Sequence, residues 1–239
     1  MNASNEILKS TGNRYFPLPD RPWKYFQQWD NTLFLHWKCS VSALRQYVPP
    51  SLEIDTVEGN AWVSLVVFSV KKLRMNGLPW LSYVSKFEEI NLRTYVVKDG
   101  IRGIYMFSLE TNKFLTVLMT RIFIGLPYIL SKIVRKQENV KSQNTKKKYA
   151  LKVKYKAGSS IGKTPIDLWL TERHCLYEIK NARMHRFDIH HTEWVLKYPI
   201  LNLKNVEYRA GKLDLGALKP DLKHYGASIK VLLCGSTAV

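Results

Sequence analysis

The chain has 239 residues, of which 46% are hydrophobic, and a formal net charge of +18 at pH 7. This composition excludes a largely disordered protein, and we expect one domain spanning residues 1–239. Three widely spaced cysteines favour reduced thiols in the cytoplasm over a disulfide framework. A secretory signal is not expected, because residues 1–6 contain no basic region followed by an apolar run. A membrane span is not expected either, because Arg121, Gly125 and Pro127 interrupt the most apolar run.

Strands outnumber helices in the predicted secondary structure, and their connections resemble hairpins, which indicates an α+β domain of mainly antiparallel strands. Strands are predicted at 31–38, 52–55, 61–70, 87–97, 103–109, 134–142, 149–156, 174–180, 183–190 and 203–209. A short helix is predicted at 42–47, capped by Ser40 or Ser42. A longer helix is predicted at 112–124, where apolar residues recur at helical spacing before Gly125.

The strand predicted at 87–97 has polar residues on one face and apolar residues on the other. The apolar face holds Ile90, Leu92, Thr94 and Val96, and the polar face holds Glu89, Asn91, Arg93 and Tyr95. The following Asp99-Gly100 dipeptide predicts a tight hairpin to the next strand. If the polar row lines a closed sheet, it forms a pocket.

The positive charge is concentrated between residues 135 and 156, where nine basic residues and one acid give a local charge of +8. Such a segment raises the alternative of nucleic-acid or anionic-surface binding. It contains only two aromatic residues, Tyr149 and Tyr155, fewer than the stacking platforms of single-strand binders require. We interpret it as a lysine-coated hairpin.

Several sequence patterns suggest catalysis or metal binding, but the residues around them do not suit these functions. Residues 157–164 fit a relaxed phosphate-binding pattern, but the preceding residues alternate lysine with apolar side chains, as in a half-exposed antiparallel strand. His190 and His191 would point to opposite faces of a strand, and no Cys-x-x-Cys occurs, so we predict no metal and no cofactor. The Gly-x-Ser-x-Gly elbow of a serine hydrolase is missing from the sequence.

A series of short segments resembles a known family in content and in order. They are LFLHW at 33–37, DTVEGNAWV at 55–63, FEEINLRTYV at 87–96, FSLE at 107–110, LPY at 126–128, LTERHCLY at 170–177 and HTEW at 191–194. The set resembles the YqjF-like family of uncharacterised proteins over about residues 23–205. That family is similar to proteins with the acetoacetate decarboxylase-like fold, in which a curled antiparallel sheet or barrel with a few packed helices surrounds an internal cavity.

The resemblance implies that the polar face beginning at Glu89 looks into this cavity. In the decarboxylases an arginine precedes a Pro-Lys-Lys element, and one of the lysines forms a Schiff base with a keto acid. Here Arg121 stands in the place of that arginine, but Pro127 is followed by Tyr128 and an isoleucine. Lys132 lies about one helical turn further on, several ångströms too far to replace the missing nucleophile. A Schiff-base decarboxylase is therefore not expected.

We predict that the chain binds a small anionic or carbonyl-bearing molecule in an internal polar cavity, with Glu89 as an acid or base in any lyase- or hydrolase-type reaction. The predicted ligand-binding residues are Asn91, Arg93, Tyr95, Arg121, Tyr128, Glu172, Arg173 and His191. Two alternatives stay open. Arg93, Glu172 and Arg173 can instead satisfy one another in a buried network, and Tyr128 can be a cavity hydroxyl or a core aromatic. The oligomeric state is left open.

Overall fold

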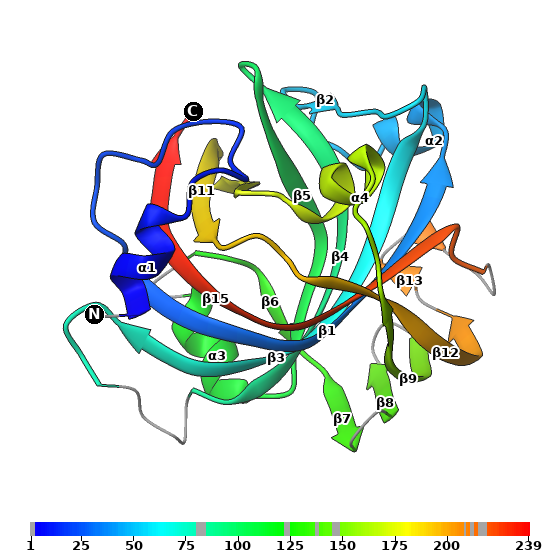
Figure 1. Cartoon of the computed structure of the whole chain (residues 1–239). Helices are drawn as coiled ribbons and strands as arrows, with labels where there is room; N and C mark the ends of the chain where they lie inside the picture. The colour runs from blue at the N-terminus through cyan, green and yellow to red at the C-terminus, as the bar shows by residue number, and fades with distance from the viewer. Residues whose placement is uncertain are drawn as a thin grey trace.

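Seven strands of the computed structural model close into a barrel (Figure 1). In order around the barrel they are β1 (Tyr25–Cys39), β3 (Ala61–Met75), β4 (Phe87–Lys98), β5 (Ile101–Thr111), β10 (Cys175–Lys180), β11 (Arg183–His191) and β15 (Leu222–Ala238). The structure describes residues 3–79, 85–121, 125–136, 139–144, 149–207, 209–210, 213–214 and 219–239. Strand β15 pairs with β11 on one edge and with β1 on the other, which closes the ring. The β5–β10 pairing is parallel, whereas the other barrel pairings are antiparallel.

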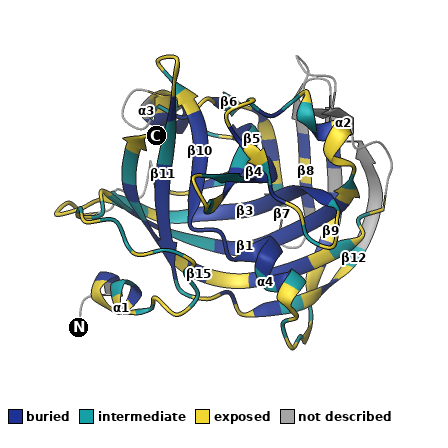
Figure 2. Cartoon of the chain, turned by 90° about the horizontal axis from the view of Figure 1, so that it is seen from above, coloured by how far each residue is buried: buried dark blue, intermediate teal, exposed yellow. Residues whose placement is uncertain are grey.

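A second group of strands continues the sheet outside the barrel. It consists of β12 (Leu196–Glu207), β9 (Tyr149–Ser160), β8 (Asn139–Asn144) and β7 (Lys132–Lys136), attached through a short β12–β15 pairing. Apolar residues of this group pack against the outward faces of β1, β3 and β4. These three strands are therefore buried on both faces, as the dark blue along them shows in Figure 2.

Four helices and four short strands complete the described part of the chain. The helices are α1 (Ala3–Lys9), α2 (Val41–Arg45), α3 (Phe114–Met119) and α4 (Pro165–Thr171), and the short strands are β2 (Glu53–Ile54), β6 (Tyr128–Leu130), β13 (Arg209–Ala210) and β14 (Leu213–Asp214). Helix α4 begins with a capping box formed by Thr164 and Asp167. Within the described residues, every helix is too short or too polar to span a membrane.

Several sequence predictions agree with the structure. Ser40 caps α2, accepting a hydrogen bond from a backbone amide in the first turn. Residues 61–70 form the fully buried part of β3. The β4–β5 hairpin turns at Asp99 and Gly100, which have φ values of 51° and 74°, the geometry that this dipeptide favours.

Other predictions were wrong or incomplete. The helix predicted at 112–124 is α-helical at Phe114–Met119 and continues as π-helix at residues 120–121, whereas residues 122–124 lie outside the described residues. The single strand predicted at 134–142 is an antiparallel pair, β7 and β8. Residues 203–207 of the strand predicted at 203–209 belong to the longer β12, residue 208 lies outside the described residues, and residue 209 begins β13. Helices α1 and α4 and strand β15 were not predicted.

Candidate functional site

The barrel encloses a cavity of about 60 Å³. A cavity of this volume has room for a small molecule. Six of the predicted site residues line it: Glu89, Asn91, Arg93, Tyr128, Arg173 and His191. Three come from β4, and the others come from β6, the segment after α4, and the end of β11.

Strand β4 brings three polar side chains to the cavity because its residues alternate between two buried faces. The apolar face, including Ile90 and Leu92, packs into the core shared with β7–β9. Glu89, Asn91 and Arg93 turn inward and are only 4%, 6% and 8% exposed. The row predicted from the alternation is therefore enclosed.

At one part of the cavity wall, Glu89 forms hydrogen bonds with two neighbours. The Asn91 side-chain amide donates to the Glu89 carboxyl at 2.9 Å, and the Tyr128 hydroxyl is also hydrogen-bonded to it. Burial raises the pKa of Glu89 to about 7, an effect that the two hydrogen bonds oppose. Burial and the adjacent Glu89 carboxyl raise the pKa of Tyr128 well above its ordinary value, so its hydroxyl keeps its proton. Glu89 can thus give or take a proton near neutral pH.

Arg93 carries a buried positive charge with few partners. Its guanidinium donates to the Leu170 carbonyl oxygen at 3.1 Å, and its Nε is buried without a hydrogen-bond acceptor. In the described part of the chain, no carboxylate forms an ion pair with it. Buried guanidinium groups are normally paired, because an unpaired buried charge is costly. Arg93 is therefore placed to receive an anion.

Arg173 differs from Arg93 because it has a carboxylate partner inside the protein. Its Nη1 lies 2.8 Å from Asp55, and its Nε donates to the Trp169 carbonyl oxygen at 2.8 Å. Burial lowers the pKa of Arg173, and the Asp55 carboxylate opposes this effect. The charge of Arg173 is thus balanced by a residue that the sequence did not suggest as its partner.

Tyr95 points inward but does not line the cavity. Its hydroxyl donates to the Leu170 carbonyl oxygen at 2.9 Å and lies 2.6 Å from the Ser64 hydroxyl. From Ser64 a hydrogen-bonded chain continues through His36 and His224 to Asp167. The Leu170 carbonyl oxygen accepts hydrogen bonds from both Tyr95 and Arg93, so this network helps to fix the position of the Arg93 guanidinium.

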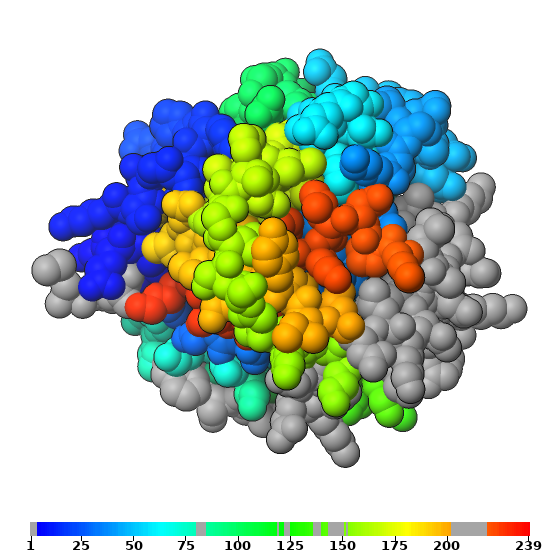
Figure 3. Space-filling model, turned by 45° about the vertical axis from the view of Figure 1, so that its right-hand side comes forward, coloured from blue at the N-terminus to red at the C-terminus, as the bar shows by residue number. Residues whose placement is uncertain are grey.

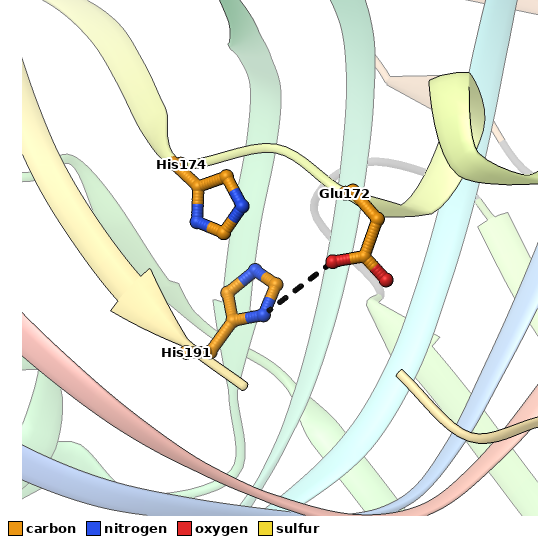
Figure 4. A group of neighbouring side chains, drawn as sticks. All are labelled: Glu172, His174 and His191. Atoms are coloured by element: carbon orange, nitrogen blue, oxygen red, sulfur yellow. Dashed lines mark ion pairs between the residues drawn. The ribbon is translucent and has the colours of Figure 1, made fainter. Parts of the chain in front are cut away.

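Glu172, His174 and His191 form a buried cluster beside the cavity (Figure 4). The Glu172 carboxylate accepts hydrogen bonds from the Asn13 side chain at 2.8 Å and the Trp194 amide at 2.9 Å. His174 donates to the Asn13 carbonyl oxygen at 3.0 Å. The N-terminal segment, blue in Figure 3, thus lies against the yellow-green and yellow segments that carry the cluster. Burial lowers the pKa of His191 to about 4, so its ring is neutral at pH 7.

Within the described ranges, these three side chains form a group that could hold a metal ion, since their ligand atoms lie within 4.8 Å of one another. Their geometry does not fit this role. The imidazole rings of His174 and His191 are stacked, with centroids 4.4 Å apart and planes inclined by 25°. Lone pairs lie in the ring planes, so two nearly parallel rings do not converge on one ion, and one ring would have to rotate first.

The remaining predicted residues lie away from the cavity. Arg121 is exposed, and its guanidinium donates twice to the Tyr128 carbonyl oxygen, at 3.0 and 2.8 Å. Glu172 lies behind His191, and neither Arg93 nor Arg173 forms an ion pair with it among the described residues. Lys132 is exposed on β7, and the lining within the described ranges includes no lysine. Of the basic segment, residues 137–138 and 145–148 lie outside the described residues.

Sequence reasoning missed an aromatic wall of the cavity formed by Trp29, Phe34, Phe68 and Trp194. Trp29 and Phe34 have opposite parity in the chain, so simple alternation places them on opposite faces. Between them, however, the β1–β3 register shifts at 30–33, and Asn31 has a φ of 51°. This irregularity turns both rings inward. The sequence offers only Asn31, a residue tolerant of positive φ, as a signal of it.

The family comparison covers most of the chain. The model of the DUF2071 family, described as "Uncharacterized conserved protein", matches residues 26–229. The uncharacterised protein YqjF of Bacillus subtilis (strain 168) is 38% identical over 188 residues, covering 75% of this chain and 78% of that protein.

Solved structures with the same fold are distant in sequence. An acetoacetate decarboxylase structure has a TM-score of 0.60 at 14% identity, covering 100% of this chain and 98% of the other. Acetoacetate decarboxylase from Legionella pneumophila has a TM-score of 0.59 at 12% identity, with coverages of 98% and 94%. The enduracididine biosynthesis enzyme MppR complexed with pyruvate has a TM-score of 0.57 at 13% identity, with coverages of 94% and 93%. The barrel is therefore acetoacetate decarboxylase-like.

Proposed function

The chain belongs to the DUF2071 family of uncharacterised conserved proteins, and on that premise we propose that it binds a small organic carboxylate in the barrel cavity. The carboxylate lies against Arg93, and the rest of the molecule extends toward Glu89 between the polar side chains and the aromatic wall. One of the similar structures, MppR, was determined with pyruvate, a small acid with a carboxylate and a carbonyl group. That observation supports a ligand of this size and chemistry.

The proposal is carried by the positive charge of Arg93, which forms no ion pair with a carboxylate in the described part of the chain. Arg173 is neutralised by Asp55, His191 is neutral at pH 7, and Glu89 is close to half-protonated there. The described lining of the cavity therefore has an excess of positive charge in a buried setting. A carboxylate relieves this imbalance and supplies an acceptor for the Arg93 Nε, which has none among the described residues.

Glu89 gives the cavity a group suited to general acid–base chemistry. With a pKa of about 7 it can protonate a carbonyl oxygen or accept a proton from an adjacent carbon, while Arg93 stabilises negative charge on the ligand. A reaction through a lysine imine is not proposed, because Tyr128 and Ile129 follow Pro127 and the described lining includes no lysine.

The test is substitution of Arg93 by methionine, which keeps an unbranched side chain and removes the charge. A panel of small carboxylates, including acetate, propionate, butyrate and pyruvate, is screened by thermal shift and then by titration calorimetry. Loss of a charge-assisted pair lowers affinity about 10- to 100-fold. Arg183→Met is the matched control, because Arg183 is exposed on β11 and its substitution changes the net charge by the same amount. Equal binding by Arg93→Met and the control refutes the proposal.

We do not propose nucleic-acid or anionic-surface binding through the basic segment at 135–156. The similar structures are acetoacetate decarboxylase-like enzymes, and they give that alternative no support.

A further inference from the structure

The aromatic wall gives the cavity an apolar side as well as a charged one. Trp29 and Phe68 are in contact, with ring centroids 5.0 Å apart, and Phe34 meets Trp194 edge to face at 5.3 Å. Trp194 also stacks with Trp29 at 6.4 Å. Rings held on several sides change position little, so together they form a rigid boundary.

Trp194 is the member of this wall whose position depends on one unusual contact. It lies in the segment before β12, where its backbone amide donates to Glu172. Its six-membered ring rests directly on Gly226 of β15. A Cβ atom at residue 226 would lie 2.5 Å from two carbons of the ring, closer than any real contact. The missing side chain therefore lets the indole withdraw from the cavity by the width of a methyl group.

The distribution of charge and apolar surface narrows the ligand class. A molecule that satisfies both walls has one carboxylate at Arg93 and an apolar body against Trp194 and Trp29. The cavity volume of about 60 Å³ is small, so a molecule enclosed in it has a short apolar body. We expect an acid with two to four carbons.

We infer that the Trp194–Gly226 contact sets the maximum length of the apolar body, so that the protein selects short-chain monocarboxylates. The inference rests on the proposed function for the position of the carboxylate. It adds that Trp194 and Gly226 determine specificity, although neither carries charge. Enlarging residue 226 shortens the preferred acid, and shrinking residue 194 lengthens it.

The experiment measures affinity for straight-chain acids from acetate to octanoate, together with the corresponding neutral amides. For the unaltered protein, affinity should rise about fourfold with each methylene that is buried, up to butyrate, and then fall. In Trp194→Leu the optimum moves to acids at least two carbons longer. In Gly226→Ala it moves to acetate, or affinity for butyrate falls by tenfold or more.

Matched controls separate specificity from general damage. Gly12→Ala tests the same change where a Cβ meets nothing within 4 Å, and Trp23→Leu removes a partly buried indole outside the cavity. Both should keep the original optimum. Because the two test variants shift the optimum in opposite directions, a loss of stability cannot produce the result. Trp194→Leu alone decides the matter if Gly226→Ala does not fold.

The possible outcomes distinguish this inference from the proposal on which it rests. An unchanged optimum in Trp194→Leu, with acid binding still dependent on Arg93, overturns the length limit and leaves the proposed function intact. Amides that bind as well as acids, with the same length limit, refute the proposed carboxylate site and retain the role of Trp194. If neither acids nor amides bind the unaltered protein, both are refuted.

Discussion

Replacing Glu89 by glutamine should abolish the pH dependence of anion binding. The Glu89 pKa of about 7 means that the cavity gains a negative charge as the pH rises through neutrality. Glu89 and Arg93 are four residues apart on one strand, which corresponds to roughly 13 Å of backbone. Because the ligand extends from Arg93 toward Glu89, its carboxylate lies no farther than about this distance from the Glu89 carboxylate. The two carboxylates repel by at least about 1.3 kcal/mol at an effective dielectric constant of about 20, equivalent to at least about tenfold in affinity.

Titration calorimetry between about pH 5.5 and 8.5 measures this effect, with an acid that stays fully ionised over the range. The unaltered protein should lose at least about tenfold in affinity as the pH rises, with the midpoint near the Glu89 pKa of about 7. Glu89→Gln should bind at all pH values about as tightly as the unaltered protein does at low pH, because a glutamine side chain never becomes charged.

Glu178→Gln is the control for this prediction. Burial also raises the pKa of Glu178 to about 7, but Glu178 does not line the cavity. Its substitution should leave the pH dependence of binding unchanged. The reasoning is refuted if binding by the unaltered protein does not vary with pH, or if Glu89→Gln keeps the same slope.

Two further predictions concern stability. The raised pKa means that Glu89 holds its proton more tightly in the folded than in the unfolded protein. The unfolding free energy should therefore fall by up to about 3 kcal/mol as the pH rises from 4.5 to 7. Urea denaturation should show this decrease for the unaltered protein and not for Glu89→Gln. Arg173→Met leaves the buried Asp55 carboxylate without its closest partner and should lower the unfolding free energy by about 3–5 kcal/mol. Adding Asp55→Leu should restore much of that loss, and a double variant no more stable than Arg173→Met would show that the charge is not the cause.

The parts of the site that follow from local sequence were predictable. Alternation along β4 placed Glu89, Asn91 and Arg93 on one face, and the apolar residues between them indicated that the other face was buried. The Asp99-Gly100 turn fixed the pairing of β4 with β5. These features depend on strand geometry and turn conformation within a dozen residues.

Features that depend on contacts between distant segments were not predictable in this way. The partner of Arg173 is Asp55, 118 residues away. Trp194 contacts Gly226, which lies on β15, a strand that the sequence pattern did not predict. Arginine, aspartate, tryptophan and glycine are each compatible with many settings, so their types alone identify no partner. Helix α4 was missed for another reason, since its capping signal at Thr164 was present in the sequence but overshadowed by the preceding Gly/Ser-rich residues.

The pairing of β1 with β15 affects how the barrel folds. Tyr25 pairs with Leu233, so the ring closes only when segments more than 200 residues apart meet. Pairing segments this far apart costs loop-closure entropy before any stabilising contact forms between them. Chains in which such pairings dominate therefore fold slowly. During synthesis on a ribosome, β1 can pair with β15 only after residues 222–238 have emerged. The enclosed cavity therefore cannot form before β15 has been made.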